Sequence, residues 1–541
     1  MRSTLWFLLL VAACTDGETD ETGPDDTGET AAPSVCEALG LSERAFVDAQ
    51  PTAALLATAS DLGIPTTEGD WSLAGHWTGC DLHLFVQDHP RQNGGLDETR
   101  FWSRDVDDLL ARSPRNVHWF FVSTESSSQD REASLATIQT AMADALADLP
   151  AEDQAWWPDR IHYIPVRHVD LPDWLGDLMA SGWGSTAGWG VGIDRFQRIR
   201  FIGSYADPER PNASAGWYDP NLSMAANEAI YWNFEADRED RLAAQDVEVI
   251  RLFDAQTISD PSWEGERAYV EVDLPDAATM TGFDAMELDL VLDCVGDGEY
   301  GTCPAWDYID WLWLCDAGAP DTCSQELGRW ITTYHREGRW VHDVSPLLPL
   351  LAQGGNRRFA FYSQQEYAVT LDLRLVRAGR STRPTQVTHL FSGGHFGETY
   401  NDAYAPVLVD IPAGAKAVKL ATVLSGHGMS SPGNCAEFCD TEHHFGVNGT
   451  DNLLSFPNAG STWGCMETVG EGTVPNQYGT WWYGRGGWCP GREVPMTVTD
   501  VTAQVTPGTT ATFTYQAFYR DEPYPGTGAE IRLEAWVVVE E

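Results

Sequence analysis

Basic side chains are scarce in this sequence. Its 541 residues include 81 Asp and Glu but only 33 Lys and Arg, which gives a formal net charge of −48 at pH 7. Binding to nucleic acid needs Lys and Arg contacts to the phosphates, so this composition argues against a nucleic-acid-binding protein. The charge says little about the fold, because much of it belongs on solvated surface.

Long hydrophobic runs are missing as well. The apolar run from Leu5 to Ala13 is too short to span a bilayer, and with Arg2 before it the run is typical of an export signal. It ends in "LVAAC", which resembles the lipobox of bacterial lipoproteins and predicts a signal at residues 1–14 with acylation of Cys14. Residues 15–35 are acidic and poor in apolar side chains, which predicts a disordered tether. Thr15 after the acylated cysteine favours an outer-membrane lipoprotein, facing the cell surface or the periplasm.

The cysteines indicate an oxidising compartment. Of the eleven, ten remain once Cys14 is set aside, and an even number in an exported chain suggests five disulfides. Connectivity cannot be read from sequence alone, but cysteines that lie close together in the chain suggest the following pairs: Cys36–Cys80, Cys294–Cys303, Cys315–Cys323, Cys435–Cys439 and Cys465–Cys489.

One short stretch, "NCAEFCDTEHHF" at 434–445, concentrates possible metal ligands. Cys435 and Cys439 are followed by His443 and His444, a set of residue types that zinc accepts. If the two cysteines form a disulfide, they cannot bind zinc as thiolates. The stretch is therefore either a metal site or a disulfide-clamped loop around Glu437.

The N-terminal third alternates strand and helix patterns, which predicts an α/β domain over residues 36–245. Its order of strands and helices, with a hairpin and a closing helix at the end, resembles the thioredoxin fold. The Cys-x-x-Cys of that fold is absent after the first strand, so we expect a redox-inactive module. Trp183 and Trp189 fall in a glycine-rich loop. The expected strands lie at 81–87, 116–124, 160–166 and, as a hairpin, 191–205, and the expected helices at 105–113, 134–149 and 224–236.

Beyond about Glu248 the pattern changes to short alternating runs separated by Gly, Pro and Asp. This pattern is typical of antiparallel β-sandwiches. Nearly 300 residues of it exceed one sandwich, so we expect two jelly rolls, at 246–383 and 384–541, divided near Ser381–Pro384.

Several motifs in this β-rich part resemble peptide:N-glycosidase F, a secreted bacterial amidase. They are C-A-E-x-C at 435–439, G-W-C-P-G at 487–491, and a Cys-bounded loop that runs into Trp-Asp at 306–307. The resemblance covers residues 265–541. It implies two side-by-side eight-stranded jelly rolls and hydrolysis of the amide between an asparagine side chain and the first N-acetylglucosamine of an N-glycan.

The resemblance also implies site residues, one for each position of this sequence that matches a family motif. Asp307 matches the principal catalytic Asp, and Glu437 matches the Glu that the second jelly roll contributes. The substrate-binding set comprises Arg485, Trp488, Phe438, His427 and Gln364. Hydrolysis of an amide asks for one carboxylate that activates water and a second, differently tuned carboxyl that orients or protonates the substrate.

The chain also departs from the family pattern. Gln364 stands where the family has a third carboxylate, and Tyr308 stands where it has Arg. These changes favour an alternative, a glycan- or glycopeptide-binding surface lipoprotein that has lost turnover. A copper monooxygenase with paired jelly rolls is another, but it needs several His and Met ligands. We expect an amidase that acts on N-glycoproteins or glycopeptides, monomeric, attached to the membrane only through its lipid, with no metal or organic cofactor.

Overall fold

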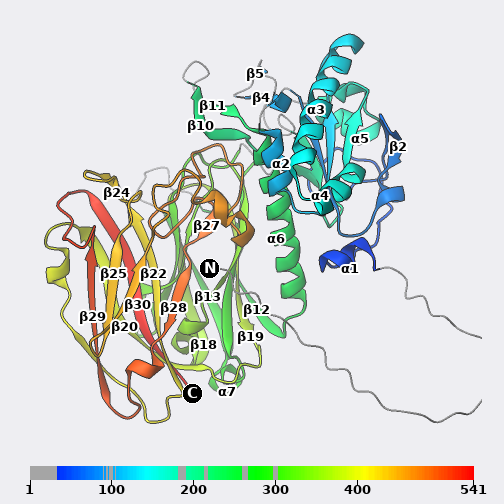
Figure 1. Cartoon of the computed structure of the whole chain (residues 1–541). Helices are drawn as coiled ribbons and strands as arrows, with labels where there is room; N and C mark the ends of the chain where they lie inside the picture. Colours follow the sequence, from blue (N-terminus) through cyan, green and yellow to red (C-terminus); the bar gives the residue numbers. More distant parts are fainter. Residues whose placement is uncertain are drawn as a thin grey trace, which may run out of the picture.

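The computed structural model describes residues 33–88, 91–92, 95–96, 101–103, 105–180, 190–212, 217–258, 266–296 and 302–541. It confirms a multidomain chain, with a mixed α/β sheet followed by antiparallel β-sandwiches (Figure 1). The predicted acylation site Cys14 and the predicted loop residues Trp183 and Trp189 lie outside the described residues. Among the helices described, none combines the length and apolarity needed to cross a bilayer.

The N-terminal module, from α1 to α6, is built around a five-stranded sheet in the order β7-β6-β3-β8-β9. The β7–β6 and β6–β3 pairs are parallel, and the β3–β8 and β8–β9 pairs are antiparallel. Every residue of β3 and β6 is buried, as expected for central strands covered on both faces. The strands are β3 (Leu82–Gln87), β6 (Val117–Val122), β7 (Ile161–Ile164), β8 (Gly190–Ile193) and β9 (Ile199–Phe201).

Helices and short hairpins surround this sheet. The longest helix, α3, begins after Ser127, whose hydroxyl accepts a hydrogen bond from the Asp130 N–H and so caps the helix. The helices are α1 (Val35–Leu39), α2 (Val106–Arg112), α3 (Ser128–Asp148), α4 (Ala151–Trp156), α5 (Asp173–Ala180) and α6 (Ala226–Ala243). The hairpins are β1 (Gly63–Thr66) with β2 (Gly69–Ser72), β4 (Arg91–Gln92) with β5 (Gly95–Leu96), and β10 (Ala206–Asn212) with β11 (Trp217–Pro220).

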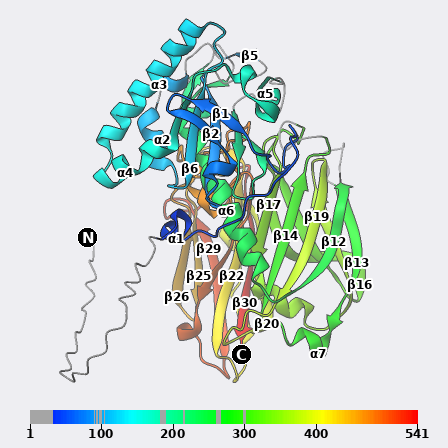
Figure 2. The same cartoon turned by 90° about the vertical axis from the view of Figure 1, so that its right-hand side faces the viewer.

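The closing helix is longer than its predicted span of 224–236, because its C-terminal half packs against the first sandwich. Arg238 donates to the Arg339 carbonyl at 2.7 Å, and Arg241 pairs with Glu287. Helix α6 therefore lies between the N-terminal sheet and the first sandwich (Figure 2).

Two eight-stranded sandwiches follow. With the strands of each sandwich counted from one to eight along the chain, one sheet has the order 1-8-3-6 and the other 2-7-4-5, in both sandwiches. The first contains β12 (Val247–Ile258), β13 (Glu266–Asp276), β14 (Ala285–Asp293), β15 (Ile309–Asp316), β16 (Ala319–Ile331), β17 (Gly338–Asp343), β18 (Gly354–Ser363) and β19 (Tyr367–Val376), with helix α7 (Ala277–Met280) between β13 and β14. The second contains β20 (Pro384–Phe396), β21 (Val407–Asp410), β22 (Ala417–His427), β25 (Glu442–Val447), β26 (Thr450–Ser455), β28 (Met496–Asp500), β29 (Thr510–Phe518) and β30 (Ala529–Glu540).

One short strand joins the two sandwiches. β27 (Arg492–Glu493) belongs to the second half of the chain but extends a sheet of the first, with Trp330 opposite Glu493 and Ile331 opposite Arg492. The long connection between β26 and β28 is thereby held against the end of β16. A two-stranded ribbon, β23 (Met429–Ser430) with β24 (Cys435–Ala436), stands at the same end of the second sandwich.

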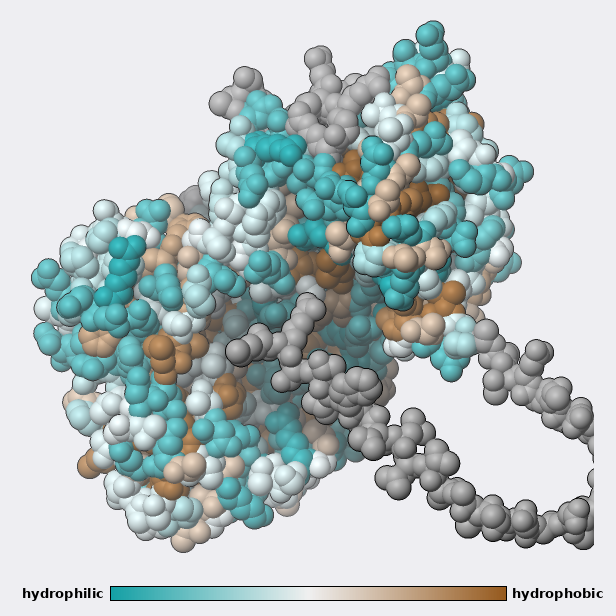
Figure 3. All heavy atoms as spheres, in the orientation of Figure 1, coloured by the Kyte–Doolittle hydropathy of each residue, from teal (hydrophilic) through white to brown (hydrophobic). Residues whose placement is uncertain are grey.

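All five predicted disulfides are present: Cys36–Cys80, Cys294–Cys303, Cys315–Cys323, Cys435–Cys439 and Cys465–Cys489. The face seen in Figure 3 is mostly teal and white with scattered brown residues, in keeping with an acidic chain.

Candidate active site

The backbone on both sides of Asp307 is fixed by one threonine. Thr332, just after β16, donates from its hydroxyl to the Trp306 carbonyl and accepts from the Tyr308 N–H, both at 2.8 Å. Its own N–H donates to the Tyr308 carbonyl. The Asp307 side chain is 17% exposed and accepts a hydrogen bond from the Tyr334 hydroxyl. The carboxylate is thus held at the entrance to β15, at one end of the first sandwich.

The second carboxylate is held equally firmly. Glu437 stands inside the small ring that the Cys435–Cys439 disulfide closes. Its N–H donates to the Gly428 carbonyl, and its own carbonyl accepts from Gly486 at 2.7 Å. A Cβ at Gly486 would approach the Ala436 carbonyl oxygen to 2.4 Å, so glycine is required for this close approach. Because Gly486 follows Arg485, the contact also fixes Arg485 beside Glu437.

Arg485 joins the two carboxylates, which come from different sandwiches. Its Nε lies 3.2 Å from a Glu437 oxygen, and its Nη2 lies 3.8 Å from an Asp307 oxygen. The guanidinium also donates to the carbonyls of Tyr483 (2.7 Å) and Thr480 (3.3 Å), and its side chain is 1% exposed. A guanidinium is the cation best suited to hold two anions in a fixed geometry.

Two of the predicted aromatic residues surround this cation. The guanidinium carbon lies 4.3 Å from the Phe438 ring centre and 5.3 Å from that of Trp488. The indole N–H of Trp488 donates to the Gly426 carbonyl, and His427 stacks on the indole at 5.2 Å. Trp488 is buried, so in this structure its ring supports Arg485 and His427, and its predicted role in substrate binding stays a prediction.

Burial and charge tune the two carboxyls differently. Burial raises the pKa of Glu437 to about 7, with the negative charge of Asp307 adding to the effect and Arg485 opposing it. Burial also raises the pKa of Asp307, while the Tyr334 hydroxyl and Arg485 favour its ionised form. Two ionised carboxylates beside a single guanidinium have a net charge of −1 in a buried site. Binding one proton to either carboxylate neutralises it. With its pKa raised to about 7, Glu437 gives up a proton only in the neutral range.

The raised pKa of Glu437 predicts a pH-dependent stability. A carboxyl whose pKa is higher in the folded than in the unfolded chain stabilises the fold below its ordinary pKa and loses that contribution as pH rises through the folded value. As pH rises from 4.5 to about 7, this group should lower the free energy of unfolding by about 3 kcal/mol. We therefore expect the melting temperature of Glu437→Gln to fall less between pH 5 and pH 8 than that of the wild type. The matched control is Glu530→Gln, an exposed glutamate on β30. Equal pH slopes in all three proteins would contradict the prediction.

Gln364 lies near the site but does not join it. It follows β18, and the pairing of Tyr362 with Trp311 places it at the end of the sheet where Asp307 precedes β15. Its side chain makes no hydrogen bond to Asp307, Glu437 or Arg485, all of which lie among the described residues. The neighbouring Glu366 is exposed.

His443 and His444 point in opposite directions from β25, as successive residues of a strand do. His443 is buried between the hydroxyls of Thr441 and Tyr515, and His444 pairs with Asp451 on the outside. Cys435 and Cys439 form their disulfide. Over the part of the chain that the structure describes, no three His, Cys, Asp or Glu side chains gather as a metal site would require.

Sequence reasoning missed Tyr334 and Thr332. Both lie in "ITTYHREGRW" at 331–340, inside the span 265–541 that the resemblance covers, but no local pattern shows that a hydroxyl there reaches Asp307. Arg485 and Trp488 also line a cavity of about 250 Å³ that extends to Asn458 and Pro495.

This chain is similar to one protein family model, one characterised amidase and two solved structures. Residues 396–538 match the family model "Peptide-N-glycosidase F, C terminal". The peptide-N(4)-(N-acetyl-beta-D-glucosaminyl)asparagine amidase F of Elizabethkingia miricola is 25% identical over 240 residues, which cover 40% of this chain and 63% of that protein, less than two thirds of it. The structure of PNGase F from Flavobacterium meningosepticum, a glycosylasparaginase, matches with 18% identity and a TM-score of 0.46, covering 55% of this chain and 96% of that one. The structure of PNGF-II matches with 14% identity and a TM-score of 0.41, covering 56% and 67% of the two chains. The resemblance predicted from the motifs is confirmed at residues 396–538, which match the C-terminal domain of the peptide-N-glycosidase F family.

Proposed function

We propose that this protein hydrolyses the amide bond between an asparagine side chain and the first N-acetylglucosamine of an N-glycan. The observation that carries the proposal is the convergence of Asp307 and Glu437, from two different sandwiches, on the buried guanidinium of Arg485. The match to this family supports the same reaction.

In the proposed mechanism the two carboxyls act as base and acid. Asp307, ionised and oriented by Tyr334, removes a proton from a water molecule as that water attacks the amide carbon. The carbon–nitrogen bond then breaks, and protonated Glu437 gives its proton to the leaving nitrogen. The products are a glycosylamine and an aspartate side chain. Arg485 stays in place throughout and compensates the negative charge as it moves between the carboxyls.

A second function is favoured by specific residues. Gln364 and Tyr308 replace a carboxylate and an Arg of the family pattern, and a cleft with two of three carboxylates could bind glycans without turnover. The deciding experiment is incubation with a denatured high-mannose glycoprotein, followed by mass spectrometry of glycans and peptides. Released glycan together with conversion of the glycosylated Asn to Asp is the expected result. Glycopeptide binding without that conversion would replace the amidase with a glycan-binding lipoprotein.

Several finer features belong to the same proposal. The strand order of the two sandwiches supports their assignment as jelly rolls, at 246–383 and 384–541, and the closing hairpin and helix support a thioredoxin-like module at 36–245. The "LVAAC" sequence supports anchoring in the outer membrane through Cys14. Metabolic labelling with a radioactive or clickable fatty acid, compared between the wild type and Cys14→Ala, tests the anchor.

A further inference from the structure

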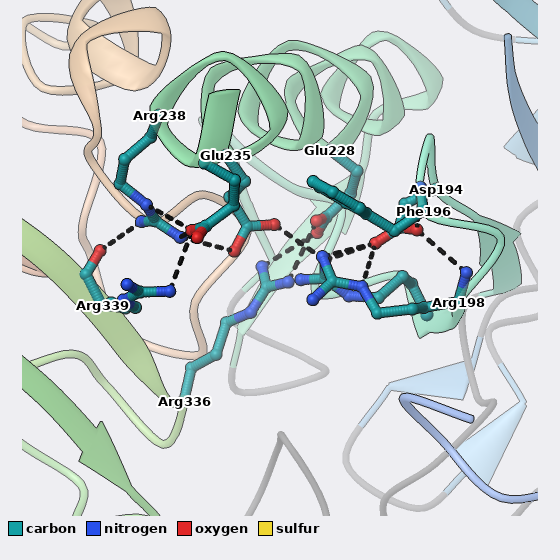
Figure 4. Close-up of polar contacts among 10 residues, drawn as sticks. Asp194, Phe196, Arg198, Glu228, Glu235, Arg238, Arg336 and Arg339 are labelled. Carbon is teal, nitrogen blue, oxygen red and sulfur yellow. Dashed lines mark hydrogen bonds and ion pairs between the residues drawn. The ribbon is translucent and has the colours of Figure 1, made fainter. Parts of the chain in front are cut away.

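The N-terminal module lies outside the region that resembles the family, yet one of its side chains reaches the supports of the candidate site. We infer that Glu228 of α6 is a positioning residue for Asp307, an inference that rests on the proposed amidase function. Glu228 is 0% exposed. It accepts two parallel hydrogen bonds from the buried Arg336 of the first sandwich, at 2.9 and 3.0 Å (Figure 4).

Arg336 ends the segment that holds Asp307. Within residues 332–336, Thr332 fixes the backbone on both sides of Asp307, and the Tyr334 hydroxyl binds its carboxylate. His335 adds a third support, since its N–H and its ring bond to the carbonyls of Pro304 and Cys303 in the loop that leads to Asp307. The guanidinium that Glu228 binds is thus one residue beyond the last of these supports.

A second connection runs from Glu228 toward Arg485. The Asn476 side-chain amide donates to Glu228 at 3.1 Å, and the Asn476 backbone carbonyl accepts from the backbone N–H of Ser204 in the N-terminal module. The adjacent Gln477 accepts the Tyr334 N–H at 2.8 Å. Residues 475–480 continue to Thr480, whose carbonyl binds the Arg485 guanidinium. Glu228 therefore holds two segments, 332–336 and 475–480, of which the first supports Asp307 and the second supports Arg485.

The location of this contact favours positioning over simple adhesion. Two other ion pairs between α6 and the first sandwich, Glu239 with Arg339 on β17 and Arg241 with Glu287 on β14, are partly exposed and do not involve the 332–336 segment. Glu228 also accepts from the Gly203 N–H, so four donors from three parts of the chain converge on one carboxylate. A displacement of about 1 Å at a catalytic group can cost about 100-fold in rate.

The test is Glu228→Gln in the full chain, which keeps the shape of the side chain and removes its charge. On an N-glycopeptide we expect kcat to fall by about 10- to 100-fold with KM changed by about twofold or less, because substrate contacts remain while Asp307 loses its fixed position. The matched control is Glu239→Gln on the same helix, with expected kinetics close to wild type. Equal kinetics for the two variants would overturn the inference.

Hydrogen exchange provides a readout that does not depend on activity. Measured by mass spectrometry, Glu228→Gln should speed exchange in peptides covering 302–310 and 332–336, and Glu239→Gln should leave them unchanged. If wild-type protein lacks amidase activity, the proposed function fails and this exchange pattern alone decides the inference. Unchanged exchange there, or the same change in both variants, would overturn it.

A double variant keeps the test decisive if Glu228→Gln does not fold. Glu228→Gln/Arg336→Gln leaves no unpaired charge in the interface, so it should fold while lacking the ionic anchor. We expect the same local rise in exchange and the same fall in kcat. Wild-type values for both would overturn the inference.

Discussion

Asp307→Asn should lower kcat on an N-glycopeptide by about 10³-fold or more, with KM little changed. Asparagine has the size of aspartate and retains an oxygen for the Tyr334 hydroxyl, but it cannot take a proton from water. The fold should not suffer, because the substitution removes a carboxylate whose pKa burial raises. Released glycan, measured by chromatography against time, gives both kinetic constants.

The matched control for this substitution is Asp316→Asn. Asp316 ends β15, the strand that Asp307 precedes, and so carries the same change at the opposite end of one strand. We expect its kinetics to equal those of the wild type. Activity of Asp307→Asn within about tenfold of wild type would remove Asp307 as the general base, since general-base catalysis contributes about 10²- to 10⁴-fold.

The elements of the fold could be predicted where sequence patterns are local. The strand expected at 81–87 is observed as β3 (Leu82–Gln87), and the hairpin expected at 191–205 as β8 and β9. All five disulfides follow from proximity of the cysteines in the chain. The two-residue strand β27 could not be predicted from a local sequence pattern, because it forms only by pairing with a sheet edge more than 150 residues away in the sequence.

In the candidate site, too, the residues in local motifs could be predicted and those that act through distant contacts could not. Asp307, Glu437 and Arg485 lie in motifs, and the structure brings all three together. The groups that hold them could not be predicted, since Thr332, Tyr334 and Glu228 act across the fold through single hydroxyl or carboxylate contacts. The family resemblance assigns Gln364 to the site, and the structure puts it at the same end of the sheet as Asp307 but without a hydrogen bond to Asp307, Glu437 or Arg485.

Arg485→Met should affect both activity and stability. Methionine fills similar space beside Phe438 and Trp488, but it leaves Asp307 and Glu437 without a cation. Breaking a buried ion pair typically costs about 3–5 kcal/mol, which should lower the melting temperature at pH 8 by about 10 °C. We expect kcat/KM to fall by about 10³-fold, because without Arg485 the pKa of both carboxyls rises and the ionised form of Asp307, which acts as the base, is disfavoured.

The pH dependence separates this explanation from a loss of packing. As pH falls toward 4.5 the carboxyls of the variant take up protons and lose their need for a cation, so the stability difference from wild type should shrink. The matched control is Arg374→Met, which removes a buried guanidinium from its pair with Glu287 in the first sandwich, away from the candidate site. It should lower stability while kcat stays near wild type. If Arg485→Met lost the same stability at pH 4.5 as at pH 8, its role would be packing, and the coupling of the two carboxyls through a single cation would have to be abandoned.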